Sequence, residues 1–152
     1  MVDAMILIKE DYKAVCQRYR EIVDKDAEYK YEAHFIVCHN AQFADDDVRF
    51  EDRNGWCQMS FLNEFAEEIL LELSNGKRLL YLFSEDSRLD CEFLVIDKNR
   101  IIRKKYLYFD MPELEEDAGR LKVENENAFL EWNDIDYFME IAKQDPDRLF
   151  EV

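Results

Sequence analysis

The sequence of 152 residues is poor in three residue types, with only three glycines, two prolines and two histidines. Neither G-x-x-x-x-G-K-[ST] nor G-x-G-x-x-G occurs, which excludes the phosphate-binding loops of P-loop and Rossmann enzymes. Basic residues are also scarce, because 20 Lys and Arg stand against 36 Asp and Glu, a formal net charge of −16. Nucleic-acid backbones and anionic membranes attract clustered basic residues. We therefore expect no direct binding to either and a basic protein as partner.

Long apolar runs are missing as well. No window approaches the ~18 apolar residues of a spanning helix, and the segment 1–9 lacks the basic start of a signal peptide. We therefore expect a cytoplasmic protein. Hydrophobic residues make up 48% of the chain and aromatic residues 14%, which is enough for a folded core despite the acidity. The length predicts a single domain over residues 1–152.

The residues that usually carry chemistry show no catalytic or metal-binding spacing. The four cysteines form no C-x-x-C pair and are expected to be reduced, buried thiols: Cys16, Cys38, Cys57 and Cys91. The two histidines lie in no zinc-type pattern, and no G-x-S-x-G elbow is present. We expect no catalytic residues, no metal and no cofactor, hence no enzyme. A nucleophile made of a cysteine and a histidine stays open, because such residues meet in space.

The periodicity of apolar residues predicts helices and strands in mixed order. Spacings of three and four predict helices at 10–23, 60–73 and 132–141, with Ser60 as the N-cap of the second helix and Pro146 after the third. Alternation and short apolar runs predict strands at 29–39, 48–53, 56–59, 78–83, 91–97 and 101–109. The expected fold class is α+β, a mostly antiparallel sheet of about five to six strands with two to three amphipathic helices.

The three strands from 78 to 109 are separated by short connections, which predict an antiparallel meander. The last of them carries Arg103, Lys104 and Lys105 in a row. Charged side chains of this kind are typical of an edge strand, where they discourage pairing with other chains. We therefore place residues 101–109 at an edge of the sheet.

Negative charge is concentrated toward the end of the sequence. Residues 111–152 hold 13 acidic and four basic residues, a net charge of −9. Solubility alone is one explanation; a surface that meets a cationic protein is the other, because charge complementarity speeds and selects association. Asp45-Asp46-Asp47 lacks the spacing of an EF-hand and is expected to be a solvated loop. The predicted partner-binding residues are Asp45, Asp46, Asp47, Glu113, Glu115, Glu116, Asp117, Asp134, Asp136 and Tyr137.

Several segments of the second half carry a resemblance to a known group of proteins. They read LYLFSED at 80–86, FLVIDKNRIIR at 93–103, YLYFD at 106–110, GRL at 119–121 followed by Glu124, and EWNDIDYF at 131–138. Over residues 78–142 this order of strands, followed by a helix led by tryptophan, resembles the small acidic α+β immunity proteins of bacterial polymorphic-toxin and contact-dependent growth inhibition systems.

The resemblance implies a non-enzymatic inhibitor that binds the C-terminal toxin domain of a secreted effector, often a nuclease, in the cytosol. The acidity agrees with this, because an acidic protein can occupy a cleft built for phosphate. Two other functions stay open. One is a cytosolic regulator or adaptor that mimics nucleic acid and binds a basic protein. The other is a small enzyme that uses a Cys–His pair or paired carboxylates.

Overall fold

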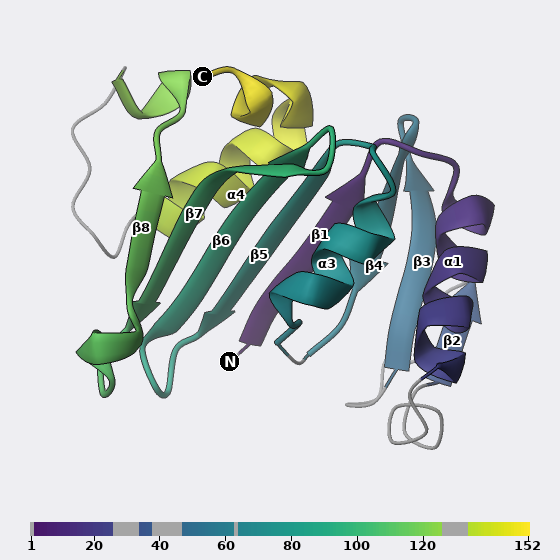
Figure 1. The fold of residues 1–152 in the computed structure, drawn as a ribbon, viewed down its shortest axis with the longest axis horizontal. Coiled ribbons are helices and arrows are strands. Elements are labelled where there is room, and N and C mark those ends of the chain that lie inside the picture. Colours follow the sequence, from purple (N-terminus) through teal and green to yellow (C-terminus); the bar gives the residue numbers. More distant parts are fainter. Residues whose placement is uncertain (1, 26–33, 38–46, 63, 126–133) are drawn as a thin grey trace.

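The centre of the computed structural model is an eight-stranded sheet (Figure 1). The structure describes residues 2–25, 34–37, 47–62, 64–125 and 134–152. The strand order is β2-β3-β4-β1-β5-β6-β7-β8, and every neighbouring pair is antiparallel except β2 and β3. The strands are β1 Val2–Ile8, β2 His34–Val37, β3 Asp47–Arg53, β4 Trp56–Ser60, β5 Leu79–Glu85, β6 Asp90–Asp97, β7 Arg100–Tyr108 and β8 Glu116–Gly119. The predicted α+β class is confirmed, with more strands than expected.

Helices lie on both faces of this sheet (Figure 1). The helices are α1 Tyr12–Asp24, α3 Glu67–Ser74 and α4 Asp134–Gln144, with 3-10 turns η1 Pro112–Leu114, η2 Lys122–Asn125 and η3 Pro146–Phe150. On what we call the front face, α1 and α3 bury a core that includes Val15, Tyr19 and Leu70. On the back face, α4, η2 and η3 bury a second core that includes Phe93 and Phe138. The sheet is therefore the shared middle layer of two cores.

The strand β1 lies near the middle of the sheet, between β4 and β5. Its side chains are apolar on both faces, with Ile6 and Ile8 in the front core and Met5 and Leu7 in the back core. A strand covered on both faces loses the alternation of polar and apolar residues that usually identifies strands. A short apolar run such as Ala4–Ile8 fits a buried strand and a buried helix segment equally well, and the sequence patterns above do not assign it.

The second helix begins later than predicted, at Glu67, and its N-cap Ala66 makes no side-chain cap hydrogen bond. Ser60 instead ends β4, opposite Met5 of β1. Aromatic residues hold the segment in between. The ring centroids of Phe61 and Phe65 lie 4.6 Å apart, and the Phe65 amide donates to the Tyr81 hydroxyl at 3.1 Å. Tertiary contacts thus override a local capping signal.

The prediction that residues 101–109 form an edge strand is wrong. β7 pairs with β6 on one side and with β8 on the other, and β8 ends the sheet. Arg103 is only 2% exposed and is bound by acidic residues instead of facing solvent. The strand at this edge, residues 116–119, consists of acidic and small residues that give no strand signal in the sequence.

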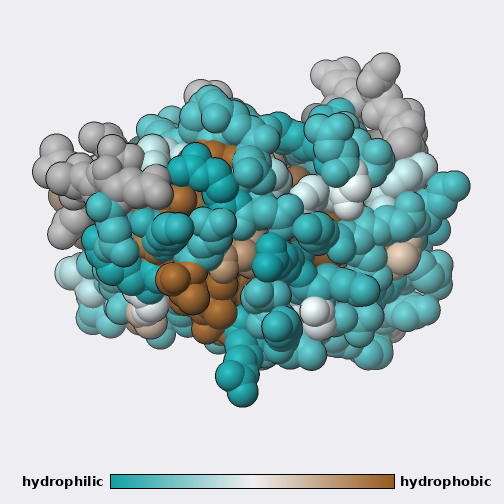
Figure 2. All heavy atoms as spheres, turned by 90° about the horizontal axis from the view of Figure 1, so that it is seen from above, coloured by the Kyte–Doolittle hydropathy of each residue, from teal (hydrophilic) through white to brown (hydrophobic). Residues whose placement is uncertain are grey.

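Three of the four cysteines are buried and free, as expected: Cys16, Cys57 and Cys91. Burial raises the pKa of Cys57 to about 12, which keeps its thiol protonated and unreactive. Cys38, Asp45, Asp46 and most of the predicted strand at 29–39 lie outside the described residues. None of the described helices is long and apolar enough to cross a membrane. Viewed along the sheet from its upper end, the surface is mainly hydrophilic, with small hydrophobic patches (Figure 2).

Candidate functional site

The connection from β7 to β8 combines exposed apolar side chains with exposed acidic ones. All residues from 109 to 120 are exposed. Phe109, Met111 and Leu114 leave 66%, 42% and 53% of their surface in solvent. The five charged residues of the stretch 109–117 are all acidic: Asp110, Glu113, Glu115, Glu116 and Asp117. We call residues 109–117 the acidic hairpin; it contains four of the predicted partner-binding residues.

Backbone hydrogen bonds give the acidic hairpin a defined shape. The Met111 amide donates to the Tyr108 carbonyl at 3.2 Å, and the Leu114 amide donates to the Met111 carbonyl at 3.0 Å. The Tyr108 amide donates to the Glu115 side chain at 3.3 Å, which closes the turn from the other strand. The exposed apolar side chains are therefore presented on an ordered turn, which lowers the entropy lost when a partner binds.

Two of the predicted acids bind basic side chains of the protein itself. Asp117 contacts the guanidinium of Arg103 at 2.5 Å, and Glu116 contacts the Lys104 ammonium at 2.5 Å. Both carboxylates keep more than half of their side-chain surface in solvent, 60% and 52%. They attach β8 to β7 and also contribute to the acidic surface. Asp110 and Glu113 are the acids of the hairpin for which the structure shows no side-chain hydrogen bond or ion pair with a described residue.

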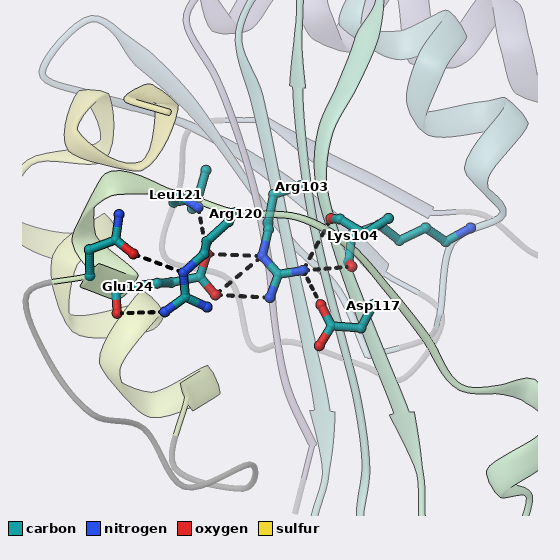
Figure 3. A network of polar contacts seen from close by, with 8 residues as sticks. Arg103, Lys104, Asp117, Arg120, Leu121 and Glu124 are labelled. Atoms are coloured by element: carbon teal, nitrogen blue, oxygen red, sulfur yellow. Dashed lines mark hydrogen bonds and ion pairs between the residues drawn. The ribbon is translucent and has the colours of Figure 1, made fainter.

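Arg103 connects the acidic hairpin to the back of the molecule (Figure 3). Its guanidinium donates to Glu124 at 2.8 and 3.0 Å, to Asp117 at 2.5 Å and to the Ala118 carbonyl at 3.1 Å. Glu124 is itself fixed by the Leu121 amide at 2.6 Å. One buried arginine thus fixes β8 and η2 relative to the sheet.

Gly119 ends β8 in a conformation that favours glycine, with φ at +80°. A Cβ atom at this position would lie 2.2 Å from the Ile102 carbonyl oxygen. The backbone of β8 therefore approaches β7 more closely than any other residue type permits. This glycine lets the acidic edge strand turn toward η2.

The other predicted residues lie elsewhere. Asp136 lines a groove of about 360 Å³ between α4 and the strands β1, β4 and β5. In the strand order this groove lies on the far side of β6 from the acidic hairpin, so the two predicted regions form separate surfaces. Tyr137 is half-buried and packs against the back core. The side chains of Asp47 and Asp134 lie outside the described part of the structure.

A buried carboxylate lies next to the acidic hairpin on the front face, and sequence reasoning missed it. Glu92 of β6 is only 5% exposed. The Tyr81 hydroxyl donates to one of its oxygens at 2.7 Å, and the Tyr108 hydroxyl donates to the other. Burial raises the pKa of Glu92 and the charges of Glu64 and Asp90 raise it further, whereas the two tyrosine hydrogen bonds oppose this increase.

A third tyrosine completes this group, which we call the Glu92–tyrosine cluster: Glu92, Tyr81, Tyr106 and Tyr108. Tyr106 is 8% exposed, and its buried hydroxyl has no hydrogen-bond partner among the described residues. Burial raises the pKa of Tyr106, and nearby negative charges raise it further: Glu92, Glu67, Glu116 and Glu64. The only sequence signals were a glutamate opening an apolar run and tyrosines spaced by two, and neither pattern shows that the residues meet across three strands.

Replacing Glu92 by glutamine is expected to make the free energy of unfolding less dependent on pH. Folded Glu92 binds its proton more tightly than the unfolded chain, where the ordinary pKa is 4.5. Its contribution to stability is therefore complete below that value and is lost as the pH rises through the raised pKa. The free energy of unfolding of Glu92→Gln should therefore increase relative to that of the wild type as the pH rises from 4.5 to 8. Urea unfolding at several pH values measures this difference.

The exposed carboxylate of Glu68 in α3 supplies the control, because Glu68→Gln removes the same charge from a solvent-exposed position. The difference between the two variants separates the effect of burial from the loss of one negative charge. Parallel curves for wild type and Glu92→Gln would mean that Glu92 is hydrated in the folded protein.

The described residues contain no group of three or more His, Cys, Asp or Glu side chains that could hold a metal ion. A Cys–His pair is not tested, because the His34 side chain and all of His39 lie outside the described part. In comparisons with known proteins, no family model, no curated protein and no solved structure matches the chain. The candidate site is therefore defined by its own geometry: an exposed, ordered acidic hairpin beside a buried carboxylate.

Proposed function

We propose that this protein is an immunity-type inhibitor that binds a basic toxin domain, a nuclease in the first instance, through the acidic hairpin. The observation that carries the proposal is the hairpin itself, in which three exposed apolar side chains alternate with acids and no basic residue occurs. Exposed apolar residues rimmed by charges are typical of protein interfaces. The hairpin is therefore better suited to bind a protein than to catalyse a reaction.

Each part of the hairpin has a distinct role in such a complex. Phe109 and Leu114 supply area that is released from water when a partner covers them. Asp110 and Glu113 supply charge at the rim, which raises the rate of encounter with a cationic surface more than it raises affinity. A nuclease presents such a surface, because its active site is built to hold phosphate. The inhibitor occupies or overhangs that cleft without chemistry of its own.

The decisive experiment is to identify the partner. The product of the neighbouring reading frame is co-expressed with this protein, purified as a complex, and assayed for toxicity and nuclease activity with and without it. A stable 1:1 complex that abolishes toxicity supports the proposal. Capture of a transcription or repair protein instead, with no effect of the neighbouring product, would favour the nucleic-acid mimic.

Reversing the charge of Asp110 and Glu113, which have no side-chain partner among the described residues, tests the role of the hairpin. Asp110→Lys combined with Glu113→Lys should slow association with the toxin domain about tenfold at low salt and flatten the dependence of the rate on salt. Dissociation should change less, because rim charges act mainly on encounter. Stopped-flow or surface plasmon resonance at several ionic strengths measures both rates.

A matched control carries the same change in net charge at the opposite end of the sheet. Glu21 on α1 and Asp52 on β3 are exposed, so Glu21→Lys with Asp52→Lys adds equal positive charge far from the hairpin. If both double variants slow association equally, overall charge and not the hairpin guides binding. Variants of Glu116 or Asp117 are avoided here, because they also break the ion pairs with Lys104 and Arg103.

A further inference from the structure

The charge of Glu92 is left unpaired by the fold. Both carboxylate oxygens accept a hydrogen bond from a tyrosine, yet no lysine or arginine among the described residues lies within ion-pair distance of them. Lys104 of β7 and Arg88 of the turn between β5 and β6 are bound to other acids, Lys104 to Glu67 and Glu116, and Arg88 to Glu64 and Asp90. A buried carboxylate without a cation is costly to maintain. A cation from a binding partner would offset this free-energy cost.

Tyr106 independently points to a missing group. Its hydroxyl is buried and has no hydrogen-bond partner among the described residues, although buried hydroxyls are nearly always paired. It lies within electrostatic reach of the carboxylates of Glu64, Glu67, Glu92 and Glu116. Three of these four carboxylates already have a basic partner, Glu67 and Glu116 in Lys104 and Glu64 in Arg88, whereas Glu92 has none among the described residues. A positively charged hydrogen-bond donor satisfies both conditions at once.

The cluster is continuous with the acidic hairpin. Tyr108 binds Glu92 through its hydroxyl, while its backbone amide binds Glu115 and its carbonyl accepts from Met111. Glu64 and Glu116, at the rim, keep 42% and 52% of their side-chain surface in solvent. A protein that covers the hairpin therefore has its own side chains next to this rim.

We propose that the Glu92–tyrosine cluster receives the guanidinium group of one arginine from the protein that docks on the acidic hairpin. This inference rests on the proposed function and adds a specific anchor to it. The guanidinium donates to Glu92 and to the Tyr106 oxygen, and because both groups are buried, side chains at their surface must move to admit it. Glu92 retains lone pairs for these bonds, because each carboxylate oxygen accepts more than one donor.

Arginine fits the site better than lysine. A guanidinium presents several donors in one plane and stacks on aromatic rings, whereas an ammonium is a compact charge that holds its water more strongly. The ring of Tyr106 already has a cation over one side, the Lys104 ammonium at 5.0 Å from its centroid. The rings of Tyr106 and Tyr108 lie edge to face at 6.4 Å, so aromatic surface continues beyond that lysine.

The test uses the full chain and three short peptides. The probes are acetyl-Gly-Arg-Gly-amide, the same peptide with citrulline, which keeps the shape without the charge, and the same peptide with lysine. NMR of the side-chain carboxyl carbons of glutamate and the ring carbons of tyrosine follows each titration. We expect the arginine peptide to shift the signals of Glu92 and Tyr106 with a dissociation constant on the order of 1 mM. The citrulline peptide should leave them in place.

Two variants connect the signal to the site. Tyr106→Phe removes a hydroxyl that has no hydrogen-bond partner among the described residues, so the fold should tolerate it. We expect the affinity for the arginine peptide to fall about tenfold. Glu92→Gln should lower it at least as much. Tyr12→Phe, on α1 at the other end of the sheet, is the control and should bind like the wild type.

Equal shifts with arginine and citrulline, or unchanged affinity in Tyr106→Phe and Glu92→Gln, would overturn the proposal. Equal binding of the lysine peptide would overturn the assignment to arginine. None of these results depends on the toxin domain. If the arginine peptide does not bind while the neighbouring product still binds the hairpin, only the arginine site is refuted. If the charge reversals in the hairpin leave association with the neighbouring product unchanged, the proposed function through the hairpin is refuted.

Discussion

Replacing Arg103 by methionine is expected to lower the free energy of unfolding by about 3–5 kcal/mol, the cost of leaving a buried charge without its partner. The side chains of Arg103 and Glu124 are each only 3% exposed, and they face each other at 2.8 Å. Without the guanidinium, Glu124 retains the hydrogen bond from the Leu121 amide and no buried cation. Urea unfolding followed by circular dichroism measures the loss.

Two further variants separate the buried pair from charge in general. Removing both partners, Arg103→Met with Glu124→Leu, should recover most of the lost stability, because an apolar pair of similar volume is often as stable as a buried ion pair. Arg100→Met removes an exposed positive charge from the same strand and should cost less than about 0.5 kcal/mol. Equal losses in Arg103→Met and Arg100→Met would show that water reaches Glu124.

The effect of Arg103 extends to the proposed interface. Asp117 of β8 depends on the same guanidinium, and β8 is the strand that fixes one end of the acidic hairpin. We therefore expect the double variant to regain stability more completely than it regains partner affinity. The distinction follows from the structure, because methionine replaces the packing of arginine without replacing its hydrogen bonds to Asp117 and the Ala118 carbonyl.

The sequence predicted the meander from β5 to β7 because its signals are local. The connection after Asp97 is a two-residue turn in which Lys98 and Asn99 both have positive φ, at 52° and 61°. Such turns join adjacent antiparallel strands, so the order of these strands follows from spacing alone. The turn at Asn54 and Gly55 is of the same kind and joins β3 to β4.

The strands β1 and β8 were not predicted because the apolar run of β1 is ambiguous between strand and helix and β8 has no strand signal at all. β1 is apolar on both faces, and β8 consists of acidic and small residues that are all exposed. What makes β8 a strand is its pairing with β7 and the ion pairs to Arg103 and Lys104. From the sequence alone, Arg103 and Lys104 indicated an edge strand, because the sequence does not show which acidic residues they will pair with.

The candidate site was predictable in composition and not in detail. The excess of acids after residue 110 indicated an acidic surface, and Glu113, Glu115, Glu116 and Asp117 are indeed exposed. Which of these acids are already paired depends on strand register, and the Glu92–tyrosine cluster depends on contacts across β5, β6 and β7. Charge patterns predict a surface, whereas the pairing of buried charges requires the fold.

Replacing Phe138 by alanine is expected to cost about 3–5 kcal/mol of unfolding free energy, because a fully buried ring leaves a cavity that the core fills only partly. Phe138 is completely buried and stacks on Phe93 at a centroid distance of 4.1 Å and an interplanar angle of 11°. This contact attaches α4 to the back of β6. Thermal and urea unfolding of the variant measure the loss.

The neighbouring residue Tyr137 gives the matched comparison, since it lies on the same helix and was predicted from sequence to bind a partner. Its ring is half-buried at the edge of the back core, so Tyr137→Ala should cost about 1 kcal/mol, the usual effect of a partly exposed position. Equal losses for the two variants would make Tyr137 a core residue and remove it from the partner-binding set. A small loss of stability combined with weaker binding of the toxin domain would instead extend the interface from the acidic hairpin to α4, which the separation of the two surfaces in the sheet argues against.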